Sequence, residues 1–437
     1  MAWFITALVV GMIPNQVLAD ELPKLPGGLN LQNILILFCL LLLMGAMGKP
    51  KATEPADMPK IPRNAKLYLL LSFLAIWYAP IFTPYADFPM SIDDHRVQEW
   101  RDEFTGILMF FVAARCFNTE AEMRRVLFVI VAASAYFVGY YLVRYYPEID
   151  RISALPMPEW FTPEEWVEEQ KWMIKKISGV FTQVGSNEMA GYYVYVAVFC
   201  MGLLWEYKKL FWRVIVPIEI AVLCMGIVYS ASRGAMLATA GGFGYAFFRH
   251  RKWIVRSTIL ASALIPAFAS DDSAAHRFEL WKAAILMGIR WPLGIGYHVF
   301  AQKNQELNGE KLDTHNYFFR AFAELGPAGF FLVIGLFAFG ARLGWKLFDT
   351  ARTDFSRGVG RGTAMMWGAL VVSNMFGDRI SYANFGVVVW TITGFCYALI
   401  LKEERERAAE AFPVVGPEPQ LDFTQAPPRP SPPAYSR

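Results

Sequence analysis

The sequence has few charged residues for its length. They make up 18% of the 437 residues, whereas soluble domains carry about 25%. The shortfall is concentrated in long apolar runs, which is typical of membrane proteins and does not fit a soluble enzyme of this size. The net charge is only +3. It gives no indication of a nucleic-acid partner, and none is expected.

Cysteines are also scarce, and their positions exclude the usual cysteine sites. None lies in a polar loop with a partner at metal-binding or redox spacing. The sequence therefore predicts no disulfide framework and no zinc site, and no metal or other cofactor is expected. All five fall inside or at the edge of an apolar run: Cys39, Cys116, Cys200, Cys224 and Cys396.

Apolar runs dominate the rest of the chain. A bilayer core of roughly 30 Å needs about 20 apolar residues per helix, and we expect an all-α, polytopic membrane bundle of about twelve transmembrane helices. The first run has the length of a signal peptide but lacks a basic start, so we interpret it as a retained helix. The runs are 3–19, 29–48, 66–83, 103–118, 125–146, 187–205, 211–230, 234–249, 253–269, 316–341, 362–378 and 383–401.

The loops between these runs alternate in charge. Acidic or weakly basic loops such as 84–102 and 147–178 separate loops that are rich in Lys and Arg. Because basic loops stay in the cytoplasm, the alternation places both termini there. The basic loops are 49–66, 115–125, 206–213, 249–256 and 342–361.

Two of the outside loops, about 147–186 and 270–315, are long. In the first, Thr162 starts an amphipathic helix that we place on the membrane surface. The second contains a predicted helix over 274–290 and forms a helical loop subdomain outside the membrane. At the other end of the chain, the proline-rich segment 413–437 lacks an apolar pattern and is expected to be disordered.

Two arginines on the outside face are candidates for anion binding. Arg233 lies in the tight Ser232-Arg233-Gly234 turn, and Arg277 shares a helix face with Trp281. A guanidinium can hold phosphate oxygens with two parallel hydrogen bonds. The alternatives are a snorkelling interfacial residue for Arg233 and a stacked Arg277–Trp281 pair on a surface helix.

His315 is the candidate proton acceptor. It lies where the second long loop enters an apolar run, and imidazole is suited to proton transfer near neutral pH. Asp313 or Asn316 could orient it, or the group could be a helix cap in which His315 is incidental. Further along this run, Arg320 and Glu324 have the spacing of a self-neutralising pair.

Asp378 and Arg379, at the outer end of a later run, could complete a polar cavity or cap a turn. Each of these groups is a weak signal alone. Together they place arginines, a histidine and aromatic residues on one side of the membrane, and this combination fits an anionic, phosphate-bearing substrate.

Four motifs give the chain a resemblance to the O-antigen ligase and polymerase superfamily, bacterial membrane glycosyltransferases that act on lipid-linked glycans. One is Gly179-Val180-Phe181 followed by Asn187 and Ala190, and another is the Ser232-Arg233-Gly234 turn. The third combines Arg277 and Trp281 with Pro292-Leu293-Gly294-Ile295-Gly296. The fourth is His315-Asn316 with Glu324-Leu325-Gly326. The resemblance covers about residues 179–341.

The resemblance implies a division of the chain and a location. Residues 1–401 form the transmembrane glycosyltransferase domain, in which the ligase-like region 179–341 includes the periplasmic loop 270–315. Residues 402–437 form a cytoplasmic tail. It also implies a multi-pass protein of the bacterial inner membrane with a periplasmic active site.

The resemblance further implies inverting, metal-independent transfer of a glycan from undecaprenyl diphosphate to a hydroxyl of a glycan, of lipid A-core or of another acceptor. His315 deprotonates the acceptor, and Arg233 and Arg277 hold the diphosphate. The supporting residues are Asn316, Glu324, Asn187 and Trp281. Arg320 departs from the expected pattern, because a tight pair with it would make Glu324 structural.

A ligase, a polymerase and a protein glycosylase share these motifs. The modest length of the outside loops favours the first two, because no separate acceptor-binding domain is visible. The alternative of another class is a transporter or flippase for an anionic lipid-linked glycan. Transporters tend to have internal repeats and charges near the membrane midplane, whereas this sequence shows no repeat and its candidate charges lie toward the outside.

Overall fold

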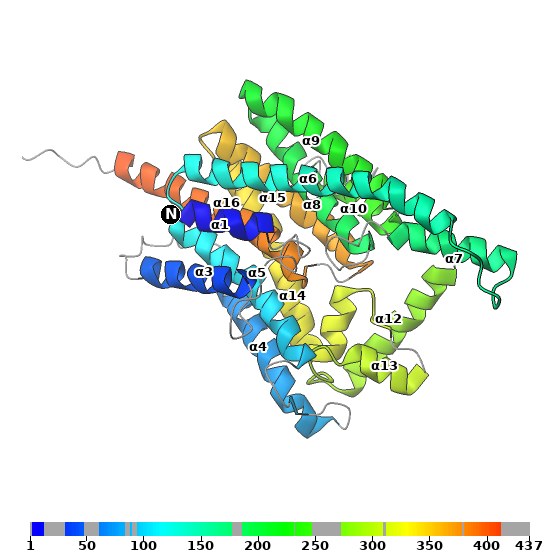
Figure 1. Cartoon of the computed structure of the whole chain (residues 1–437). Helices are drawn as coiled ribbons and strands as arrows, with labels where there is room; N and C mark the ends of the chain where they lie inside the picture. Colours follow the sequence, from blue (N-terminus) through cyan, green and yellow to red (C-terminus); the bar gives the residue numbers. More distant parts are fainter. Residues whose placement is uncertain are drawn as a thin grey trace, which may run out of the picture.

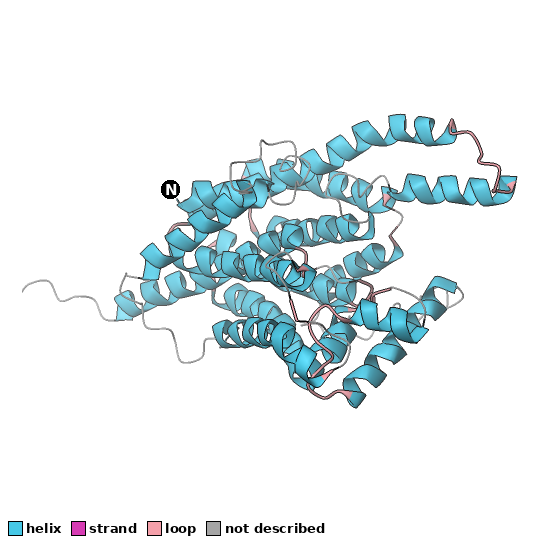
Figure 2. Ribbon diagram, turned by 60° about the horizontal axis from the view of Figure 1, so that its bottom comes forward, coloured by secondary structure: helices cyan, strands magenta, loops and turns pink. Residues whose placement is uncertain are grey.

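The protein is a helical bundle in the computed structural model. The structure describes residues 2–12, 31–47, 61–83, 88–89, 94–176, 186–230, 232–246, 272–308, 312–377 and 380–411. Every regular element in these ranges is a helix (Figure 2). The prediction of an all-α fold is therefore confirmed.

Eleven of the twelve predicted apolar runs coincide with helices. The remaining run, 253–269, and the proline-rich segment 413–437 lie outside the described residues. The eleven helices are α1 (Ala2–Met12), α3 (Leu31–Met47), α4 (Ile61–Phe82), α5 (His95–Cys116), α6 (Glu120–Ser153), α8 (Ser186–Glu206), α9 (Leu210–Tyr229), α10 (Arg233–Ala246), α14 (Tyr317–Thr350), α15 (Asp354–Asn374) and α16 (Ala383–Ala411).

Five of these helices, α4, α8, α9, α14 and α16, are long and apolar enough to cross a membrane by length and composition. Some of them also expose apolar side chains that a soluble protein would bury. On α4 and α9 such side chains recur along one face: Leu67, Leu70, Leu74, Ile81, Phe211, Val214, Ile218, Met225 and Val228. A multi-pass membrane protein is therefore supported, while the number of twelve spans stays a prediction.

Three helices lie outside the predicted runs: α7 (Pro163–Lys176), α12 (Asp272–Arg290) and α13 (Phe300–Asn308). The predicted start of α7 is confirmed. Glu165 N donates to Thr162 Oγ1 at 3.3 Å, and Thr162 N donates to Glu165 Oε2 at 2.9 Å, which is a reciprocal capping box. The helix predicted over 274–290 is α12, and α13 was not expected. In Figure 1, α12 and α13 lie together beside α14.

Close helix packing organises the centre of the bundle. The helix α16 packs along α5, and α15 packs against α8, α10 and α14. Glycine allows the closest of these approaches: a Cβ added to Gly202 of α8 would overlap the backbone of Gly362 in α15. Small residues that let backbones meet are typical of helix contacts in membranes.

The two ends of the bundle differ in charge. At one end, ion pairs join Arg361 to Glu206 at 2.5 Å and Lys402 to Glu120 at 3.2 Å. We call this the basic end, because it also carries Lys208, Lys209, Arg213, Arg352 and Arg357. The starts of α8, α10 and α14 and the end of α15 meet at the opposite end, which we call the site end.

Candidate active site

His315 lies at the site end, on the turn that leads into α14. Asn316 caps this helix: its side-chain oxygen accepts hydrogen bonds from Phe318 N at 3.0 Å and Phe319 N at 3.1 Å. Its Nδ2 donates to Met375 O, just after α15, at 3.2 Å. Asn316 thus fixes the position of His315 relative to two helices. Its supporting role in a reaction stays a prediction.

The loop before His315 is held from both sides. Trp281 of α12 donates from Nε1 to Thr314 O at 3.0 Å, and Thr314 N donates to Asp313 Oδ1 at 2.7 Å. His315 itself has a positive φ of 48°, a conformation that costs a residue with a side chain roughly 1–3 kcal/mol. The turn therefore holds His315, an exposed residue, in a fixed place.

Charged groups from three elements act on His315. The loss of surrounding water lowers its pKa below the usual value near 6.5, Asp313 opposes this shift, and the positive charge of Arg277 adds to it. Glu188 near the start of α8 and His276 of α12 act more weakly. The imidazole is therefore neutral at neutral pH and able to accept a proton.

Arg277 lies near enough to His315 for its positive charge to act on the imidazole. Asn187, half-buried in the first turn of α8, precedes Glu188, which also acts on His315. Arg233 begins α10 and is exposed. Gly226, near the end of α9, packs against Tyr193 near the start of α8. The end of α9 therefore lies at the site end, and so does Arg233, which follows the short turn between α9 and α10.

Glu324 is hydrogen-bonded to the backbone of the loop between α12 and α13. Its Oε1 accepts a hydrogen bond from Phe300 N at 3.2 Å, and its carboxylate also accepts one from the backbone of His298. Its backbone carbonyl accepts a bond from Gly296 N at 3.1 Å. The glutamate thus ties the loop between α12 and α13 to α14.

The two glycine-containing motifs interlock at this point. Gly294 (φ 84°) and Gly326 (φ 67°) both need a left-handed backbone. A Cβ on Gly294 would overlap the carbonyl oxygen of Glu324, and one on Gly326 would overlap that of Pro292. The Pro292–Gly296 and Glu324–Gly326 motifs therefore form one backbone joint that positions the loop.

Arg320 forms ion pairs with two further carboxylates besides Glu324. It is buried and lies 3.7 Å from Glu324, 3.6 Å from Glu103 of α5 and 3.9 Å from Asp313. The expected pair with Glu324 is thus present within a larger group that holds three carboxylates around one guanidinium. Through Asp313 this group reaches the loop that carries His315.

Glu103 is a polar residue of this region that the sequence did not single out. It accepts hydrogen bonds from Tyr68 at 2.8 Å and from Tyr317 at 3.2 Å. A carboxylate at the start of a predicted membrane run is the signal that could have found it. A small cavity of about 20 Å³ adjoins these groups, enough for about one water molecule; it is lined by Tyr68, Glu103, Ile107, Tyr317, Leu336, Phe337, Ile380 and Trp390.

Several predicted residues lie outside the described part of the chain. These are Asp378, Arg379 and the motif at 179–183. One group with metal-ligand geometry is also present at the site end, formed by His95, Glu99 and His298. Burial raises the pKa of the Glu99 carboxyl to about 7.

Residues 177–334 match the family model described as O-antigen ligase. This match supports the resemblance to the O-antigen ligase and polymerase superfamily over this part of the chain. The match covers α8 to the first half of α14 and contains Arg233, Arg277, His315 and Glu324. The match supports a glycosyltransferase-type membrane enzyme that uses, in general, lipid-linked glycan and acceptor substrates. It does not support the transporter alternative. No curated protein matches the chain.

Proposed function

We propose that this O-antigen ligase-type protein transfers a glycan from undecaprenyl diphosphate to an acceptor hydroxyl on the periplasmic side of the inner membrane. The observation that carries the proposal is the placement of His315. Its imidazole is held on a strained, exposed turn, has a lowered pKa and lies within electrostatic reach of Arg277. A neutral base beside a fixed cation suits attack on a diphosphate-linked sugar.

The proposed step is a direct displacement. His315 takes the proton of the acceptor hydroxyl, whose oxygen forms a bond to the anomeric carbon. The bond between that carbon and the phosphate oxygen breaks, and undecaprenyl diphosphate leaves with the electron pair. Attack opposite the leaving group inverts the anomeric configuration. Arg277 and Arg233 stabilise the charge on the departing diphosphate, so that the step needs no metal.

The orientation follows from the two ends of the bundle. The basic end carries Lys and Arg residues of the kind that favour the cytoplasm. This supports a periplasmic site end and cytoplasmic termini. The acceptor is a hydroxyl of a growing glycan or of lipid A-core. Asn316 and Trp281 hold the loop of His315, Asn187 lies beside Glu188, and Glu324 fixes the neighbouring loop.

The test is to replace His315 or Arg277 with Ala and to analyse surface polysaccharide on a gel. We expect loss of long glycan at unchanged protein level. A capped lipid core without long glycan indicates a ligase, and products with a single repeat unit indicate a polymerase. Lys282→Ala removes another cation of the same helix, exposed and paired with Glu279 at 3.7 Å, and should leave the glycan unchanged. Normal glycan in both site variants would refute the proposal.

A further inference from the structure

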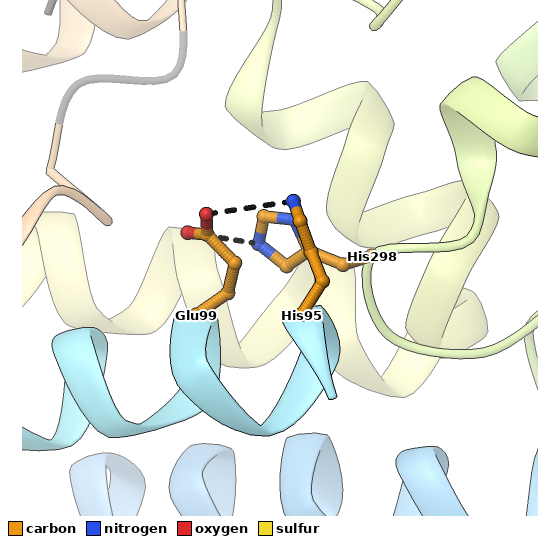
Figure 3. A group of neighbouring side chains, drawn as sticks. All are labelled: His95, Glu99 and His298. Atoms are coloured by element: carbon orange, nitrogen blue, oxygen red, sulfur yellow. Dashed lines mark ion pairs between the residues drawn. The ribbon is translucent and has the colours of Figure 1, made fainter. Parts of the chain in front are cut away.

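Three potential metal ligands from two distant parts of the chain meet at the site end. His95 and Glu99 lie four residues apart on the first turns of α5, so they share a helix face. His298 comes from the loop between α12 and α13. Figure 3 shows the carboxylate of Glu99 facing both imidazoles, with Glu99 Oε1 3.8 Å from His95 Nε2 and Oε2 3.8 Å from His298 Nε2.

The separations suit a single ion. One ligand atom from each residue lies within 4.8 Å of the others. Zinc binds nitrogen and oxygen ligands at about 2.0–2.2 Å, so two ligands on one ion are at most about 4.3 Å apart. A small movement closes the difference, and His95 is free to make it because 72% of its side chain is exposed.

His298 gives the second, independent indication. Only 13% of its side chain is exposed, and its buried Nε2 has no hydrogen-bond partner among the described residues. Leaving a buried polar nitrogen unpaired is costly. Its backbone has a φ of 55°, also unusual for a residue with a side chain, and donates to Glu324. The fold thus holds this nitrogen toward Glu99.

The surrounding charges favour a cation. The charges that act most strongly on Glu99 are those of one guanidinium, Arg320, and three carboxyls, Asp102, Glu103 and Asp313. Carboxyl groups therefore outnumber cations around Glu99, while the charges that act on His298 are those of Arg320 and His95.

We infer that His95, Glu99 and His298 bind a divalent transition-metal ion such as Zn²⁺. Two imidazoles and a carboxylate leave a fourth position open for water or another ligand, and imidazole ligands select Zn²⁺ and similar ions over Mg²⁺ and Ca²⁺. The ion ties the start of α5 to the loop between α12 and α13. The metal site is separate from the displacement proposed at His315 and does not depend on it.

The test uses the full-length protein in detergent, purified through a tag without histidines and treated with EDTA. Titration calorimetry with Zn²⁺ should show one ion per chain, and a matching titration with Mg²⁺ should show none. His95→Ala and Glu99→Gln should each weaken Zn²⁺ binding by roughly tenfold or more, which is about 1.4 kcal/mol for each factor of ten. Because His95 is exposed, its replacement should leave the fold intact.

The control is His315→Ala, which should bind Zn²⁺ as the wild type does whether or not it transfers glycan. Failure of the proposed function would therefore leave this result unchanged. Absence of stoichiometric Zn²⁺ binding by the wild type, or equal binding by His95→Ala and Glu99→Gln, would overturn the inference.

Discussion

His315 and His298 are the described residues, glycine aside, whose backbone has a positive φ. Such conformations persist where the surrounding structure enforces them, and they concentrate at functional sites. At His315 the enforcing contacts are the Asn316 cap and the hydrogen bond from Trp281 to Thr314. The strain is therefore linked to the two residues that the O-antigen ligase motifs place around the histidine.

The pH dependence of transfer should report the protonation of His315. The neutral imidazole is the active form, so the rate should fall as the pH decreases through a pKa below 6.5. The partial loss of surrounding water and the charge of Arg277 lower this pKa, His276 lowers it further, and Asp313 and Glu188 raise it. Arg277→Gln removes a nearby positive charge, so the acid limb of its residual activity should move to higher pH. The measurement is the pH profile of glycan transfer in membranes.

Lys282→Gln is the matched control for this profile, because it removes a charge from the exposed face of α12. It should leave the acid limb where the wild type has it. An unchanged acid limb in Arg277→Gln would mean that Arg277 does not act on the catalytic proton acceptor.

Trp281→Phe tests how the loop is held. The change keeps most of the ring contact but removes the hydrogen bond from Nε1 to Thr314 O. We expect a loss of about 1 kcal/mol in stability together with a larger fall in transfer, because His315 is less well placed. Thermal unfolding in detergent and a transfer assay measure the two effects. A loss of stability with full activity would argue against a positioning role.

At the scale of elements, α14 is interrupted at Gly326, whose backbone is not helical. The joint between this break and the loop after α12 decides where the site residues lie. Gly294→Ala and Gly326→Ala each force a side chain onto a left-handed backbone and against a carbonyl oxygen. We expect each to destabilise the protein by at least about 2 kcal/mol. Gly139→Ala on the exposed face of α6 meets no atom within 4 Å and should be neutral or stabilising by up to about 1 kcal/mol.

Thermal unfolding of the three variants provides this comparison. If Gly294→Ala and Gly326→Ala unfold at the same temperature as Gly139→Ala, the two motifs are not a structural joint. The two motifs would then have to act in another way, for example by contacting the substrate near His315.

The sequence predicted the helices and the local motifs, because both depend on short-range patterns. Apolar runs located eleven helices, and Thr162 with Glu165 gave the start of α7. The sequence did not reveal which polar residues, distant along the chain, contact one another in the folded protein. Glu103 and Tyr317 are hydrogen-bonded although they are 214 residues apart, and His298 reaches Glu99 through a backbone turn. The helical spacing of His95 and Glu99 was the one local signal of the metal site.

At the scale of the whole molecule, the charge difference between the two ends organises both stability and orientation. Arg352 lies 3.9 Å from Glu403, and Lys346 lies 3.3 Å from Glu404, so ion pairs join the end of α14 and the turn after it to α16 at the basic end. The site end instead buries Arg320 among carboxylates. Uneven distribution of Lys and Arg sets the direction of insertion, so we expect the same residues to keep the basic end in the cytoplasm.

This orientation is testable with introduced cysteines. Glu164 is exposed in α7, at the site end. Arg405 is exposed in the last turns of α16, at the basic end. In intact spheroplasts a membrane-impermeant maleimide should label Glu164→Cys and not Arg405→Cys, and after permeabilisation it should label both. The wild type is the control, because Cys39, Cys200 and Cys396 are buried and Cys116 and Cys224 are partly buried. The reverse labelling pattern would place His315 in the cytoplasm, where a periplasmic transfer reaction is impossible.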